Sequence, residues 1–156
     1  MPKYKAHLAG GLIFCIVSII LITKLKLFNL QLNYLPIYIS FCLFGSLFPD
    51  IDTKSKIQKF SYYPLFLLTL IAIFMQNWLI LTILSFIIFI PILANHRNLT
   101  HRKWFVIVVP AIIPILAIHY KLSESNLVFS GYIFFVIGAL SHLLLDFGPR
   151  KFFKFK

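Results

Sequence analysis

Six long apolar stretches dominate this sequence and leave few ways for it to fold in water. They run approximately over residues 8–23, 34–49, 62–76, 78–94, 104–119 and 127–145. An α-helix crosses the apolar part of a bilayer with about 20 residues, and because several of these stretches are shorter, we expect their ends to extend into the polar flanks. We therefore expect an all-α, polytopic integral membrane protein with about six transmembrane helices, in which residues 1–156 form a single domain.

The composition supports this prediction. The chain is 60% hydrophobic and 12% charged, with a mean hydropathy of +0.93, whereas soluble domains carry about 25% charged residues. A net charge of +11 would suggest a nucleic-acid partner for a soluble protein. Here the basic residues stand in short loops beside apolar stretches, where membrane topology and anionic lipids explain them better. We expect membrane lipids as partners and no nucleic acid, and we expect Cys15 and Cys42 to be buried, reduced thiols.

The loops predict the orientation in the membrane. Only Gln76 and Asn77 separate the third and fourth stretches, and we interpret them as a tight turn because one helix over 62–94 would be too long for a single crossing. Six crossings then bring both termini to one side. That side receives twelve basic residues and the other side three, which together are the 15 in the chain. The positive-inside rule places the richer side in the cytoplasm, so we expect a multi-pass protein of the inner (cytoplasmic) membrane.

Seven histidines and aspartates fall on this same side, at the ends of apolar stretches. They are His7, Asp50, Asp52, His96, His101, His142 and Asp146. Imidazoles and carboxylates are the usual ligands of zinc, manganese and iron, and polar residues at the border of a bilayer tend to be functional. Seven ligands exceed the four of a tetrahedral zinc. They suit two divalent transition metals about 3.5–4 Å apart, with zinc the first choice and manganese or iron open.

Two of the motifs contribute carboxylates, and each has a simpler interpretation. His142 and Asp146 are four residues apart, so a helix presents both on one face; they could ligate a metal or only hydrogen-bond each other. Asp50 and Asp52 follow Pro49 in an expected extended turn from which both could reach one centre, one of them bridging two metals. The simpler alternative for this pair is a solvated loop with capping aspartates.

The remaining motifs contribute histidines. His96 and His101 enclose the loop HRNLTH, and His101 could instead act as a general acid or base, or both could be interfacial side chains. Arg97 suits the oxygens of a phosphate, or it is one of the positive charges on the cytoplasmic side. His7 could be a ligand or an isolated polar anchor.

The motifs KAHLAGG, GSLFPDID, HRNLTHR and GALSHLLLD, taken together and in this order, resemble the YdjM/YbcI-like family of membrane-bound, metal-dependent hydrolases. The resemblance extends from position 7 to 146. It implies a small multi-spanning inner-membrane protein in which the seven histidines and aspartates are the metal ligands. The family usually has HRGxTHS, whereas Asn98 and Arg102 stand here in place of Gly and Ser. Asn tolerates left-handed backbone angles, while Arg102 adds a charge that bears on substrate specificity.

These observations favour a membrane-embedded hydrolase with a binuclear metal site that faces the cytoplasm. A substrate that arrives from the membrane interface would be a lipid-like anionic phosphoester, and the late HxxxD is also similar, by analogy only, to that of zinc-dependent phospholipases C. We expect catalytic roles for His101 or Asp52 in proton transfer and for Arg97 in binding an anionic oxygen.

A non-catalytic protein with a structural metal site stays open as an alternative. A metal transporter is less favoured because no charged residue lies in the middle of any stretch. The substrate, the bond and the oligomeric state stay open.

Overall fold

The structure is a computed structural model that describes residues 4–52, 56–76, 81, 84 and 100–152. Helices account for most of these residues, and the described part of the chain contains no strand, which confirms the all-α prediction. The elements are α1 (Tyr4–Leu25), η1 (Leu32–Tyr34), α2 (Leu35–Leu47), η2 (Phe48–Asp52), α3 (Lys56–Phe74), α5 (Lys103–His119) and α6 (Ser125–Phe152), where η marks a 3-10 helix.

The apolar stretches predicted from the sequence correspond well to these helices. α5 differs from its predicted range by one residue, and α1 and α6 extend into the polar residues on both sides. α3 ends at Phe74, and the backbone at Gln76 is left-handed with φ of 51°, so the third helix ends at the turn predicted there. The predicted helix 78–94 lies almost wholly outside the described residues.

Three described helical segments are long and apolar enough to cross a membrane: Tyr4–Leu25, Leu32–Asp50 and Ser125–Phe152. Two shorter apolar helices, Leu65–Phe74 and Lys103–His119, accompany them. The prediction of an apolar helical protein is confirmed for these elements, which are candidates for membrane spans by their length and composition. The number of six crossings and the cytoplasmic side of the termini stay predictions.

The chain divides into two compact units. Unit 1 comprises residues 1–49 and 101–156, and unit 2 comprises residues 50–100. Unit 1 contains α1, α2, α5 and α6. In unit 2, α3 contributes Leu65 and Ala72 to a small apolar cluster with Leu84. The single domain expected from the sequence is not tested by this division and stays a prediction.

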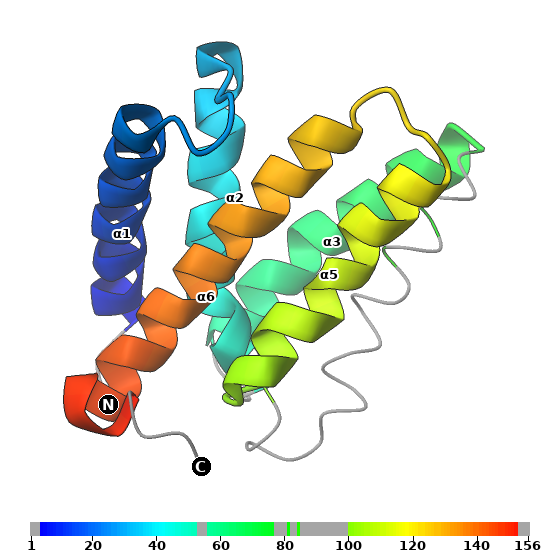
Figure 1. Cartoon of the computed structure of the whole chain (residues 1–156). Coiled ribbons are helices and arrows are strands. Elements are labelled where there is room, and N and C mark those ends of the chain that lie inside the picture. The colour runs from blue at the N-terminus through cyan, green and yellow to red at the C-terminus, as the bar shows by residue number, and fades with distance from the viewer. Residues whose placement is uncertain (1–3, 53–55, 77–80, 82–83, 85–99, 153–156) are drawn as a thin grey trace. The chain divides into compact units, whose positions relative to one another are not determined.

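Within unit 1, α6 packs against α1, α2 and α5 (Figure 1). Glycines allow the closest approach, because a Cβ built at Gly138 of α6 would overlap the carbonyl oxygen of Cys42, and one at Gly45 of α2 would overlap that of Phe135. Small residues at helix contacts are usual in membranes, where lipid tails provide no hydrophobic force between helices. The close contact of α2 and α6 fixes where their ends lie.

The middle of unit 1 is an apolar core of buried side chains from α1, α2 and α6. It contains Cys15, Ile22, Tyr38, Cys42 and Phe134. The rings of Tyr38 and Phe134 stack with their centroids 5.0 Å apart. Both cysteines are free and buried, as predicted, and the Cys42 thiol donates a hydrogen bond to the Gly11 carbonyl over 3.3 Å. This core contains none of the histidines and aspartates that the sequence singles out as candidate ligands.

Candidate metal centre

The carboxylate of Asp146, near the end of α6, is surrounded by three imidazoles of unit 1. Its Oδ1 lies 3.5 Å from Nε2 of His7, in the first turns of α1. Its Oδ2 lies 3.3 Å from Nε2 of His142, one turn earlier in α6, and 3.6 Å from Nε2 of His101, just before α5. The Asp146 side chain is only 6% exposed. Each carboxylate oxygen therefore faces a different set of histidines.

The starts of α1 and α5 and the end of α6 lie at one end of unit 1 (Figure 1). That arrangement agrees with the sequence argument, which expected these helix ends on one face of the membrane. His7 and His142 stack with ring centroids 3.8 Å apart and planes 17° from parallel. His101 meets the ring of His142 edge-on, with centroids 5.7 Å apart. Ring contacts thus hold the three imidazoles in place around the carboxylate.

The hydrogen bond of Nδ1 indicates which nitrogen of His142 carries the hydrogen. Its Nδ1 lies 2.7 Å from the carbonyl oxygen of Ser46 in α2. A carbonyl only accepts, so Nδ1 carries the hydrogen and donates it. In the neutral ring, Nε2 then directs a lone pair toward Oδ2 of Asp146. This nitrogen is then available as a metal ligand, and histidines that bind metals usually donate their other N–H in this way.

The distances agree with a metal centre better than with direct hydrogen bonds. An N–H···O hydrogen bond is about 2.7–3.2 Å long, whereas the three contacts of Asp146 are 3.3–3.6 Å. Two ligands of a tetrahedral zinc at bond lengths of about 2.0–2.1 Å are about 3.3 Å apart. Among the described residues, the buried Oδ1 of Asp146 and Nδ1 of His7 have no hydrogen-bond partner. The donor set therefore fits a divalent metal.

Asp50 belongs to the same group. One ligand atom each from Asp50, His101, His142 and Asp146 lies within 4.8 Å of the others. Asp50 is bonded directly to Pro49, which is buried at the end of unit 1, and follows Ser46 by four residues. Because the Ser46 carbonyl binds His142, the chain itself keeps Asp50 beside this histidine.

The comparison with protein families agrees with the resemblance that the motifs carry. A family model described as YdjM inner membrane protein matches residues 1–151. The chain belongs to the YdjM inner membrane protein family. The family resemblance is thereby confirmed, and the inner membrane named in the family description fits the three apolar helical segments. Neither the comparison with curated proteins nor that with solved structures found a match.

Not all candidate residues of this YdjM-family protein can be placed. His96 and Arg97 lie outside the described residues, as does the side chain of Asp52. The catalytic roles expected for Asp52 and Arg97 therefore stay predictions. His101, the third catalytic candidate, stands at the cluster with 14% of its side chain exposed. His7, Asp50, His101, His142 and Asp146 come together, and their role as ligands is taken up under the proposed function.

One expectation about local structure was wrong. The segment that follows α2 forms a 3-10 helix over Phe48–Asp52, not the extended turn predicted for Asp50 and Asp52. Pro49 fixes its φ near −65°, which suits a 3-10 helix. Sequence reasoning also missed the part played by Ser46, because that residue acts through its backbone carbonyl and side-chain motifs carry no signal for such a contact.

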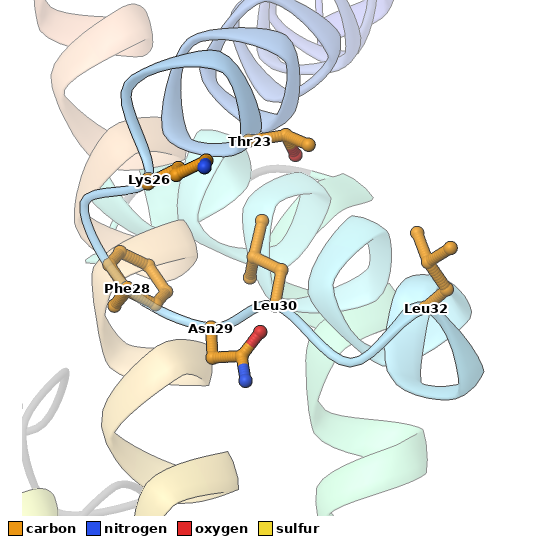
Figure 2. A pocket seen from close by; sticks show the side chains of 6 residues that line it. All are labelled: Thr23, Lys26, Phe28, Asn29, Leu30 and Leu32. Atoms are coloured by element: carbon orange, nitrogen blue, oxygen red, sulfur yellow. The ribbon is translucent and has the colours of Figure 1, made fainter.

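A pocket of about 420 Å³ lies elsewhere in unit 1, where the chain passes from α1 to α2 (Figure 2). It is lined by Thr23, Lys26, Phe28, Asn29, Leu30 and Leu32. Thr23 follows His7 by 16 residues in α1, which is about 24 Å along the helix. The pocket therefore contains none of the candidate ligands and is a separate feature of the opposite end.

Proposed function

We propose that this protein is a membrane-embedded, metal-dependent hydrolase with a binuclear His/Asp centre at the cytoplasmic interface. One observation carries the proposal: the two oxygens of the buried Asp146 carboxylate face different histidines at 3.3–3.6 Å. A carboxylate in this position can serve as the ligand shared by two ions, a role that the sequence alone assigned to Asp50 or Asp52. Membership of the YdjM inner membrane protein family supports the location in a membrane.

The contacts of the two Asp146 oxygens assign the candidate ligands to two ions. Oδ2 of Asp146, with His101, His142 and Asp50, would hold one ion. Oδ1 of Asp146, with His7, would hold a second ion, for which Asp52 and His96 are the further candidates from the sequence. Zinc is the first choice, with manganese or iron open. When bound, such a pair of ions supplies an activated water and positive charge for the oxygens of the substrate.

The contacts of His142 and His101 indicate the role of each histidine. The Ser46 carbonyl holds His142 in the tautomer that leaves Nε2 available as a ligand. His101 directs its Nε2 toward Asp146, so this nitrogen is better placed to ligate than to carry a proton. With His96 as the further ligand of the second ion, proton transfer would fall to Asp52 and the binding of an anionic oxygen to Arg97.

The location of the cluster favours a lipid-like phosphoester as substrate. The ligands stand at the ends of apolar helices, where lipid headgroups meet water, and Arg102 stands beside them at the start of α5, exposed. Basic side chains at this level attract anionic headgroups. The site would thus receive its substrate from the bilayer.

A structural metal site is the second candidate, and the burial of the cluster favours it. The side chains of His142, His7 and Asp146 are 0%, 2% and 6% exposed. Structural sites are closed, whereas catalytic sites keep an open position. Hydrolysis measured beside metal content separates the two: bound metal with no turnover of any lipid phosphoester would favour the structural site.

The test is the metal content of detergent-purified protein, measured by elemental mass spectrometry beside hydrolysis of lipid phosphoesters. Wild type should hold about two transition metals per chain, and Asp146→Asn should hold at most one and lose hydrolysis. Glu124→Gln, which changes an exposed carboxylate before α6, should behave like wild type. Absence of metal from the wild type, even after reconstitution with zinc and manganese, would refute the metal site.

A further inference from the structure

The end of α6 turns sharply two residues after Asp146. Gly148 has φ of 69° and ψ of 160°, which interrupts the helix, and Pro149 follows. A Cβ built at Gly148 would meet nothing within 4 Å. Glycine is therefore needed here for its backbone conformation and not for space, because a positive φ strains residues with a side chain. The turn redirects the last residues of the helix.

Lys103 at the start of α5 holds this redirected end. Its ammonium donates a hydrogen bond to the carbonyl oxygen of Phe152. The same ammonium lies 4.5 Å from the centroid of the Phe152 ring, within the range of a cation–π interaction. Because His101 is two residues before Lys103, these contacts keep the end of α6 close to the metal centre.

The turn and the start of α5 together gather positive charge. Arg150 and Lys151 precede Phe152 and are exposed, and Arg102 precedes Lys103 and is also exposed. Trp104 follows directly and is 51% exposed. Exposed tryptophans of membrane helices lie at the level of the lipid headgroups. The four basic residues therefore belong to the headgroup region beside the metal centre.

We propose that Arg102, Lys103, Arg150 and Lys151 form a binding site for the phosphate headgroup of an anionic membrane lipid. A guanidinium and an ammonium on each of the two segments provide several donors for phosphate oxygens. Positive charges that only set topology would need neither the turn at Gly148 nor the contacts of Lys103. The site goes beyond the proposed hydrolysis, since it binds such a lipid whether or not the metal centre cleaves it.

Trp104 provides a direct probe of this site. The chain has two tryptophans, so Trp78→Phe leaves Trp104 as the single one. Reconstituted in phosphatidylcholine vesicles, this variant should be quenched more strongly by brominated phosphatidylglycerol than by brominated phosphatidylcholine at equal content. Arg150→Gln and Lys151→Gln should each weaken the preference about fivefold, which is the effect of one basic residue at an anionic surface.

Controls separate this site from general attraction and from the metal centre. Lys24→Gln, in the last turn of α1, and Lys121→Gln, in the loop after α5, should keep the preference. The preference should also survive removal of metal by a chelator, so that failure of the hydrolase proposal leaves it intact. Equal quenching by the two lipids, an unchanged preference in Arg150→Gln/Lys151→Gln, or loss of the preference to millimolar inorganic phosphate would overturn the lipid site.

Discussion

The contact between α2 and α6 contains two polar regions that differ in how their groups are satisfied. In the first region, the Ser141 hydroxyl donates a hydrogen bond to the Gly138 carbonyl over 2.7 Å. The Cys42 thiol donates a hydrogen bond to the Gly11 carbonyl. We call this the middle region. One residue further along α6, His142 belongs to the metal centre, where the carboxylate of Asp146 and the imidazoles lie 3.3–3.6 Å apart.

We interpret this difference as that between a structural contact and a candidate metal centre. Burial of a polar group is costly unless it is hydrogen-bonded. In the middle region, the Ser141 hydroxyl binds a carbonyl of the same helix, and the Cys42 thiol binds a carbonyl of the neighbouring helix α1. The metal centre instead brings ionisable groups together at distances too long for good hydrogen bonds. Such an arrangement is stable when a cation joins the groups, and this is the basis of the following predictions.

The largest effect is expected from removal of the metal. Incubation of the purified wild type with a chelator should lower its free energy of unfolding by about 4 kcal/mol if the metal had been present at about 1,000 times its dissociation constant. Thermal unfolding in detergent, followed by circular dichroism, measures the change. Asp146→Ala, which should hold at most one metal, should respond less to the chelator, and a response equal to that of the wild type would contradict the role of Asp146.

A smaller but still large effect is expected from Gly138→Ala in the middle region. The added Cβ would overlap the Cys42 carbonyl, a backbone group that cannot move alone, so we expect a loss of about 3 kcal/mol. Gly10→Ala is the matched control, since its Cβ would meet only the end of the Leu145 side chain. Equal unfolding temperatures for the two variants would show that α2 and α6 do not pack this closely.

The smallest change in stability is expected from Ser141→Ala. Its hydroxyl bonds within its own helix, so its removal should cost less than about 1 kcal/mol and leave the metal content unchanged. His142→Gln, at the next residue and equally buried, should lose bound metal. If Ser141→Ala lost as much metal as His142→Gln, the distinction between the two regions would be wrong.

Most of the helical fold could be predicted from the sequence because apolar length is a strong local signal. The number and order of the apolar stretches then indicated that His7, His101, His142 and Asp146 meet at one end. That prediction depended only on the order of the helices, and the contacts of Asp146 agree with it.

The details of the site depend on contacts that no side-chain pattern encodes. The Ser46 carbonyl that orients His142 arises from the packing of α2 on α6. The central place of Asp146 arises from the packing of α1 and α5 against α6. The turn at Gly148 could not be predicted either. A glycine followed by proline after an apolar stretch suggests that the helix ends there, whereas α6 continues in a new direction to Phe152. The 3-10 helix at Asp50 replaced the expected extended turn for a similar local reason, the fixed φ of Pro49.

X-ray absorption at the edge of the bound metal, recorded on detergent-purified wild type, tests the central claim most directly. A centre in which Asp146 is shared by two ions should give a first shell of nitrogen and oxygen at about 2.0–2.1 Å that includes imidazole scattering. It should also give a metal–metal vector at about 3.5–4 Å. A shell of oxygen alone, without imidazole and without a second metal, would contradict the binuclear His/Asp centre.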